Sequence, residues 1–233
     1  MKRKKTTNWK NRGFEFLSIF IAVISAFALN NWNENRRDDN SGNKILIEIS
    51  NGLKKDLDDI KLNKMGHQMG ISACQYFGDL ISGKRIDKDS IVSNYFILTR
   101  DFVSIQNVAG YETLKSQGLE LIKNDSLRLQ IISLYEYNYN TLQKLEEEYS
   151  EMQFQESYFK EINNELAPNF NFDDNGKISG INLPLKITED KKKILLSYLW
   201  KIQTNREFIL GFYGEIENKI LGIQQQINTK NNS

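Results

Sequence analysis

The sequence is poor in the residues from which many catalytic and metal sites are built, with one cysteine and one histidine among its 233 residues. A lone cysteine, Cys74, excludes an intramolecular disulfide and a Cys-x-x-Cys site. With His67 as the only histidine, a His-based catalytic triad is hard to build, and no second histidine can complete a zinc site. The sequence also has no phosphate-binding glycine loop and no nucleophile elbow. We therefore expect no catalytic residue, no cofactor and no metal site, and a protein that is not an enzyme.

Proline is almost absent and glycine is rarely clustered, and both facts favour long helices. The two prolines are Pro168 and Pro184, and long stretches lack the glycine clusters that punctuate sheets. The charges almost balance, with 31 lysines and arginines against 30 aspartates and glutamates. No overall basic field would therefore attract nucleic acid. The sequence predicts an all-α protein that does not bind nucleic acid.

One uncharged apolar segment lies near the N-terminus, from Phe16 to Leu29. As a helix it spans about 21 Å, which is short of the roughly 30 Å hydrocarbon core of a bilayer. Counting over residues 13–32 brings the length to about 30 Å. Trp9 and Trp32 then lie at the two membrane interfaces, where tryptophan is enriched, and Glu15 lies at the headgroup end.

The same segment has features of a cleaved signal peptide and of a retained anchor. A basic n-region, an apolar h-region and the Ala26-Phe27-Ala28 site fit cleavage. Against cleavage, the n-region is long, and the residues after Leu29 continue a helical pattern without proline or glycine. No cysteine follows, which argues against a lipoprotein. We favour a retained signal-anchor, a transmembrane helix over residues 14–32, and keep cleavage and a buried soluble helix as alternatives.

More basic residues precede this helix than closely follow it. The basic residues that precede Glu15 are Lys2, Arg3, Lys4, Lys5, Lys10 and Arg12. Only Arg36, Arg37 and Lys44 follow closely. The positive-inside rule then places a basic tail, residues 1–13, in the cytoplasm and the chain after residue 33 outside it.

Small residues recur within the predicted membrane helix. Ser18, Ala22 and Ala26 are spaced every fourth residue, and Asn30 continues the row. Such a strip lets two membrane helices approach closely. Chance placement of small residues on a lipid-facing helix explains it equally well.

After a predicted juxtamembrane stalk over residues 33–43, apolar residues recur every seven residues in three segments, as in long amphipathic helices. The first segment predicts a helix over residues 44–82 and contains Leu46, Leu53, Ile60, His67, Cys74 and Ile81. The second begins at Asp125, as a predicted N-cap, continues to Pro168 and contains Ile131, Asn138, Leu145, Met152, Phe159 and Leu166. The third opens at Thr188 and contains Leu195, Ile202, Ile209, Ile216 and Ile223.

Two shorter helices are predicted over residues 88–105 and 109–117, the second ending near Gly118. Together with the three long helices they predict an elongated antiparallel bundle over residues 44–228. Residues 229–233 are expected to form a disordered tail.

His67 and Cys74 invite a metal-site interpretation, but their spacing opposes it. Seven residues along a helix is about 10.5 Å, too far for both side chains to bind one zinc ion. Both fall on the apolar seam. We therefore expect a packed cysteine and a hydrogen-bonded or pH-sensitive histidine.

The segment 171–182 resembles a calcium-binding EF-hand loop, with Asn171, Asp173 and Asn175 at ligand positions. It lacks the usual first Asp, and Asn182 replaces the bidentate Glu. A β-hairpin turning at Asn175-Gly176, the strongest short hairpin signal, is the favoured alternative. We predict a hairpin or loop insertion over residues 168–187.

Two stretches, "ALNNWNENRRD" and "AGYETLKSQGLELIKNDSLRLQIISLYE", resemble an uncharacterised family of small single-pass membrane-anchored bacterial proteins, a domain of unknown function common in the Bacteroidota. The residues that carry the resemblance are Asn30, Asn31, Trp32, Asn33, Glu34, Tyr111, Leu114, Gly118, Leu119, Ile122, Asn124, Leu127 and Arg128. The resemblance implies that the N-terminal segment is retained, and it supplies no activity and no catalytic residue. The apolar run here is richer in phenylalanine and alanine than the family pattern, so helix-packing details do not carry over.

The second of these stretches is where we would look for a family-specific contact, with Tyr111, Lys115, Asn124 and Arg128 as candidate partner contacts. A structural turn with Gly118 at a helix end explains the stretch more simply. With the charge asymmetry, the resemblance predicts a bacterial inner-membrane protein whose bundle lies in the periplasm.

Three functions remain open at this stage. The first is a non-enzymatic helical bundle of the cell envelope that is anchored in the lipid bilayer. It binds an unknown envelope protein or self-associates as a homo-oligomer. The second is a ligand-sensing bundle coupled to a separate signalling partner. The third is a carboxylate-dependent envelope enzyme, which a pocket containing buried acids with raised pKa values would favour.

Overall fold

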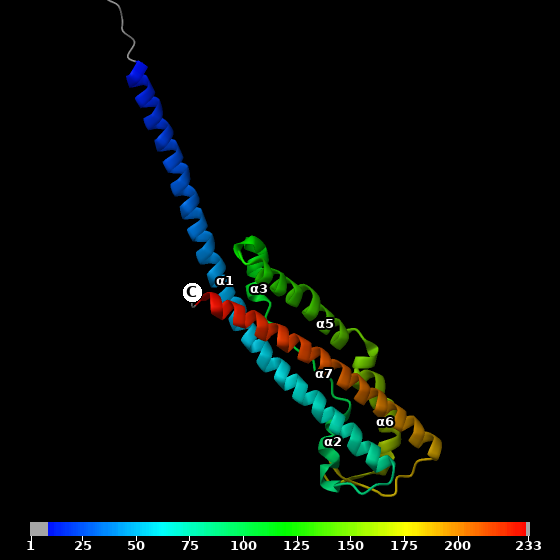
Figure 1. The fold of residues 1–233 in the computed structure, drawn as a ribbon. Coiled ribbons are helices and arrows are strands. Elements are labelled where there is room, and N and C mark those ends of the chain that lie inside the picture. Colours follow the sequence, from blue (N-terminus) through cyan, green and yellow to red (C-terminus); the bar gives the residue numbers. More distant parts are fainter. Residues whose placement is uncertain (1–8, 232–233) are drawn as a thin grey trace, which may run out of the picture.

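The computed structural model describes residues 9–231 and shows an elongated, almost wholly helical bundle from which one helix projects (Figure 1). The projecting helix is α1 (Trp9–Ile81), a single helix of 73 residues. It includes the predicted membrane helix over residues 14–32, the stalk over residues 33–43 and the first bundle helix. The stalk is therefore helical, and no break in the backbone separates it from the bundle.

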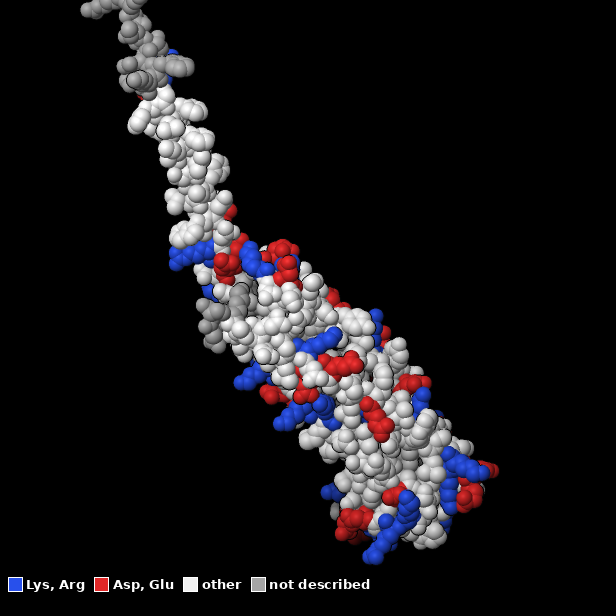
Figure 2. Space-filling model, viewed as in Figure 1, with Lys and Arg blue, Asp and Glu red and all other residues white. Residues whose placement is uncertain are grey.

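The first third of α1 is uncovered by the rest of the protein. Every side chain from Arg12 to Arg37 is exposed, and the first buried residue is Gly42. Figure 2 shows the middle of this part as a white, uncharged rod between charged residues at its two ends, projecting from the charged surface of the bundle. The apolar part of this helix is long and apolar enough to cross a membrane, and none of it is buried. Lys2, Arg3, Lys4 and Lys5 lie outside the described residues.

The helix α7 (Glu189–Asn231) runs antiparallel to α1 and forms the second layer of the bundle. Lys64 of α1 pairs with Glu217 at 2.6 Å, and Gln224 donates to the Ser50 carbonyl at 3.3 Å. The predicted seam residues of both helices are buried. Thr188 precedes α7 as predicted, and its Oγ1 accepts from the Lys191 N–H at 3.4 Å. α7 reaches Asn231, beyond position 229 where we expected the tail to begin.

The third layer is not the single helix that we predicted from Asp125 to Pro168, and that prediction is wrong. The chain forms α4 (Asp125–Ile132), a π-helical turn (Ser133–Tyr139), α5 (Asn140–Glu147), a 3-10 turn (Ser150–Met152) and α6 (Phe154–Leu166). The helical path is interrupted after α5, and where α6 begins the Phe154 N–H donates at 2.6 Å to Asp101, which is distant in sequence. The N-cap of α4 is Asn124, not Asp125, since its side chain accepts from the Leu127 N–H at 3.0 Å.

The predicted helix over residues 88–105 is also too long. A 3-10 turn (Lys88–Ser90) leads into α2 (Ile91–Leu98), and residues 99–108, which we call the strap, run without helix. The predicted short helix is confirmed as α3 (Ala109–Gln117). It ends at Gly118, whose φ of 115° is a conformation that favours glycine, and a 3-10 turn (Leu119–Leu121) follows.

The predicted hairpin is confirmed. After a 3-10 turn (Ala167–Asn169), strand β1 (Phe170–Phe172) pairs antiparallel with β2 (Ile178–Ile181). Gly176 has a φ of 74° in the turn. The Asp173 carboxylate accepts from the N–H groups of Asn175 at 2.9 Å and Lys177 at 2.8 Å, so the residue at the centre of the calcium interpretation organises the turn.

The buried apolar residues form two clusters along the bundle. The proximal cluster, near the projecting helix, joins α1, α3, α4, α5 and α7 around residues such as Leu53, Leu142 and Ile216. The distal cluster joins the far end of α1 to α2, α6, the hairpin and the start of α7, around Phe77 and Ile202. Polar residues are also buried in the middle of the bundle, and we call them the polar layer. They are Asp56, Asn63 and His67 of α1, Ser104 of the strap, Glu146 of α5, and Asn205 and Arg206 of α7. The strap passes through this layer.

Candidate functional site

Arg206 of α7 lies at the centre of the polar layer and is fully buried. Its Nη2 donates to the carbonyls of Leu98 at 3.2 Å and Arg100 at 2.9 Å, where the strap begins. The guanidinium lies 4.2 Å from the ring centroid of Phe154. A Cβ at Gly70 of α1 would overlap the guanidinium, so glycine is needed there for the close approach. Burial lowers the pKa of Arg206 to about 10, which leaves it charged at neutral pH.

His67 lies beside this arginine and is held neutral. Its Nδ1 is 3.2 Å from Arg206 Nη1, a donor in every state, so Nδ1 accepts and Nε2 carries the hydrogen. Burial, and next the charge of Arg206, lower the pKa of His67 to about 3. The ring is enclosed by aromatic side chains, with Phe102 at 5.5 Å and Tyr213 at 5.8 Å between centroids. His67 and Cys74 are both buried on the seam, as expected.

The carboxylates of the polar layer bind the N–H groups of the strap. Glu146 of α5 accepts from the Ser104 N–H at 3.1 Å and from the Tyr213 hydroxyl. Asp56 of α1 accepts from the Asn107 N–H at 2.8 Å and from the Tyr139 hydroxyl at 2.7 Å. Asp59 accepts from the Ile105 N–H at 3.0 Å. Burial raises the pKa of Glu146 to about 7.

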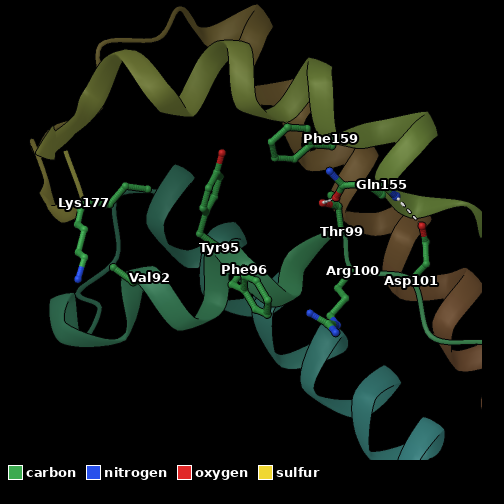
Figure 3. A pocket seen from close by; sticks show the side chains of 10 residues that line it. Val92, Tyr95, Phe96, Thr99, Arg100, Asp101, Gln155, Phe159 and Lys177 are labelled. Carbon is green, nitrogen blue, oxygen red and sulfur yellow. Dashed lines mark hydrogen bonds between the residues drawn. The ribbon is translucent and has the colours of Figure 1, made fainter. Parts of the chain in front are cut away.

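Beyond the strap, at the end of the bundle far from the projecting helix, lies a pocket of about 730 Å³ that we call the distal pocket (Figure 3). Its lining comes from α2, the start of the strap, the start of α6 and the hairpin. The lining residues are Val92, Tyr95, Phe96, Thr99, Arg100, Asp101, Gln155, Phe159, Lys177 and Ile178. Half of these ten residues are apolar or aromatic.

Hydrogen bonds fix the walls of the distal pocket. The Tyr95 hydroxyl donates to Asn163, and the Thr99 hydroxyl donates to Gln155 Oε1 at 2.8 Å. Asp101 bridges the strap to the first turn of α6 through the backbone N–H groups of Phe154 and Gln155. Both long walls, α2 and α6, are therefore tied to each other and to the strap.

The four candidate partner contacts are used within the chain, at the end of the bundle near the projecting helix. Tyr111 is buried, stacks on Tyr135 with centroids 4.5 Å apart and donates to Glu136 at 2.9 Å. Lys115 also pairs with Glu136, at 3.0 Å. Asn124 caps α4, and Arg128 donates to the Ile122 carbonyl at 2.9 Å and pairs with Asp125 at 2.8 Å. Each of the four stabilises the α3–α4 corner.

The residues predicted for the membrane helix lie on the uncovered part of α1. The four residues spaced every fourth position are exposed: Ser18, Ala22, Ala26 and Asn30. Glu15, at the start of the apolar segment, is exposed as well. The Ser18 hydroxyl donates to the Phe14 carbonyl at 2.8 Å, and Asn30 donates to Glu34 at 3.0 Å. Trp32 is exposed, and its ring lies 5.7 Å below the Arg36 guanidinium. Trp9 is within α1, but its side chain is not among those described.

The residues that organise the polar layer and the distal pocket were not predicted. Arg206 lies in the register of the third seam, between Ile202 and Ile209, and a charged residue inside an apolar seam is a signal that the sequence does contain. Glu146, next to the seam residue Leu145, carries a weaker signal of the same kind. The pocket has no such signal, since its walls come from four separate segments.

No family model, no curated protein and no solved structure matches this chain. The resemblance to the family of membrane-anchored proteins therefore stays a prediction. Conclusions about function rest on the contacts, burial and charges of this chain.

Replacing Arg206 tests whether the polar layer holds the strap. In Arg206→Met the side chain keeps its length, but the carbonyls of Leu98 and Arg100 lose their donor. Unsatisfied buried polar groups cost about 1–3 kcal/mol each, so we expect a loss of about 3 kcal/mol or more in the free energy of unfolding, measured by urea denaturation. Arg85→Met, at an exposed position, is the control and should change stability by less than about 0.5 kcal/mol. Equal stability of the two variants would contradict the assignment.

The buried histidine makes stability depend on pH. Folded His67 has a pKa of about 3 against an ordinary 6.5, so the unfolded chain binds more protons between these values. Its contribution to stability is therefore lost as the pH falls from 6.5, by about 1.4 kcal/mol per pH unit. Glu146 has the opposite sign, since its raised pKa makes its contribution fall as the pH rises from 4.5 to about 7.

His67→Gln separates the two effects, because the amide oxygen can still accept from Arg206 and Glu146 is unchanged. Between pH 6.5 and 4.5 the variant should lose about 2–3 kcal/mol less stability than the natural protein. Urea denaturation of both proteins at several pH values measures the difference. Parallel stability curves would show that His67 does not titrate on unfolding.

Proposed function

We propose that this protein is a non-enzymatic, single-pass membrane protein whose helical bundle binds a protein partner, or a second copy of itself, at the bacterial cell envelope. The observation that carries the proposal is the continuity of α1, which is apolar and uncovered over residues 14–32 and forms the bundle core from Gly42 onward. Apolar surface costs about 25 cal/mol per Å² in water, so a solvent other than water accounts best for this uncovered segment. Because α1 continues without a break into the bundle, this helix holds the bundle at a fixed distance from the lipid.

The charge asymmetry supports an orientation with the N-terminus in the cytoplasm and the bundle in the periplasm. The state of the acids supports a non-catalytic role. Glu146 and Asp56 use their oxygens on strap N–H groups and tyrosines, and neither lines the distal pocket. Asp101 is the one acid of the pocket lining, so the pocket holds no cluster of acids. Burial raises the pKa of Asp101, but its oxygens accept from the first turn of α6.

An exposed apolar strip on α1 supports binding of a protein surface. Leu62, Met65 and Met69 are 62%, 56% and 48% exposed and share the face of α1 opposite the core. Single exposed apolar side chains are common, but a row spaced three and four residues apart is the pattern by which helices contact one another. The strip could receive a helix of an envelope protein or of a second copy.

A ligand-sensing bundle is the second candidate function, and the distal pocket is the observation that favours it. The pocket volume lies within the range of about 300–1,000 Å³ that is typical of small-molecule sites. Signalling from this pocket would require a separate signalling partner.

Cysteine labelling tests the anchor and its orientation. Cys74 is buried and its pKa is raised by burial to about 12, so the natural protein should react little with maleimides. In cells with a permeabilised outer membrane, an impermeant maleimide should label Asn51→Cys but not Lys4→Cys. Both should be labelled after the inner membrane is lysed. Recovery of the protein in the soluble fraction with Leu29 at its N-terminus would overturn the proposal.

Photo-cross-linking tests the apolar strip. A photoreactive amino acid at Met65 should yield a cross-linked product in cells, while the same residue at exposed Gln143 of α5 serves as the matched control. A product of twice the mass of the chain indicates self-association, and any other mass indicates an envelope partner. Absence of a specific product at Met65, or equal products at both positions, would contradict a role of the strip.

A further inference from the structure

The distal pocket combines an apolar interior with positive charge. Tyr95, Phe96 and Phe159 supply aromatic surface between α2 and α6. In Figure 3 Lys177 lies at one end of the group of side chains, and Arg100 lies between Phe96 and Asp101. Phe96 is 65% exposed even though it lies in a helix that packs on the core. So large an exposed ring beside a pocket is the apolar surface that a ligand would cover.

The two cations are available to a ligand. Within residues 9–231, neither Arg100 nor Lys177 forms an ion pair with a carboxylate. The guanidinium of Arg100 lies 5.0 Å from the ring of Phe96, which leaves its hydrogen-bonding edge open. Asp101, the one acid of the lining, forms no ion pair with either cation, and its oxygens accept from backbone N–H groups of α6.

Polar groups of the lining add a donor rather than another acceptor. Gln155 Oε1 accepts from the Thr99 hydroxyl at 2.8 Å, so the amide Nε2 is the group that Gln155 can offer. Tyr95 directs its hydroxyl to Asn163 and presents its ring to the pocket. The lining therefore offers two cations, one amide donor and several aromatic faces, and its one acid, Asp101, is hydrogen-bonded to α6.

We propose that the distal pocket binds an amphipathic carboxylate of the fatty-acid class. The apolar chain lies on Tyr95, Phe96 and Phe159, and the carboxylate pairs with Arg100 or Lys177. A neutral apolar molecule would leave both cations without a partner, and an amphipathic cation would be repelled. The hydrogen bond that Thr99 donates and those that Asp101 accepts hold the walls in place before a ligand arrives, which lowers the entropic cost of binding. This inference goes beyond the anchoring proposal and does not depend on the orientation in the membrane.

Calorimetric titration of the full chain in lipid nanodiscs tests the proposal, with empty nanodiscs to subtract partitioning into the bilayer. Sodium decanoate is the probe, and decanol and decyltrimethylammonium are its neutral and cationic counterparts. We expect one saturable decanoate site with a Kd of about 10–100 μM, at least about 10-fold weaker binding of decanol and no saturable binding of the cation. The absence of a saturable decanoate site, or equal affinity for decanol, would overturn the proposal.

Variants assign the binding to the pocket. Arg100→Gln combined with Lys177→Gln should weaken decanoate binding about 10-fold or more and leave decanol binding unchanged. Phe96→Ser, at an exposed ring, should weaken both ligands several-fold. Lys54→Gln combined with Lys61→Gln removes two exposed charges of α1 and is the matched control. Unchanged binding in the pocket variants, or an equal loss in the control, would show that the affinity is not due to this pocket.

Discussion

The strap imposes the constraint on which the middle of the bundle depends. A segment without helix or sheet partners must find other partners for the N–H and C=O groups that face the core. In the strap Thr99 and Ser104 are buried, while Val103, Ile105 and Val108 are exposed. Here Glu146, Asp56 and Asp59 receive the N–H groups, and Arg206 supplies the donors for the carbonyls. The polar layer exists because of this need, and it divides one core into a proximal and a distal cluster.

The same constraint positions the distal pocket. Arg206 holds the start of the strap, and the Asp101 carboxylate accepts from the N–H of Phe154, the first residue of α6. The two long walls of the pocket are α2, which leads into the strap, and α6. The pocket therefore lies next to the interruption of the third layer between α5 and α6.

Sequence periodicity predicted what depends on local spacing. The seams of α1 and α7, the glycine at the end of α3 and the hairpin at Asn175-Gly176 all follow from rules that act within a few residues. The break after α5 did not follow from such rules, since Asp101 lies 53 residues before Phe154. The four candidate contacts near Tyr111 were chosen from a resemblance, and the structure gives each an internal partner.

The sequence by itself determined that one segment is long and apolar enough to cross a membrane and that the first and last parts of the bundle fold as long helices with buried seams. Both properties are local, since they depend on composition and on a seven-residue repeat. Only the tertiary structure decided which charged residues would be buried and where a pocket would open. The sequence places Arg206 in the third seam, but its partners are set only when the strap, α1 and Phe154 are brought around it, because burial and pairing are properties of segments that meet only in the fold.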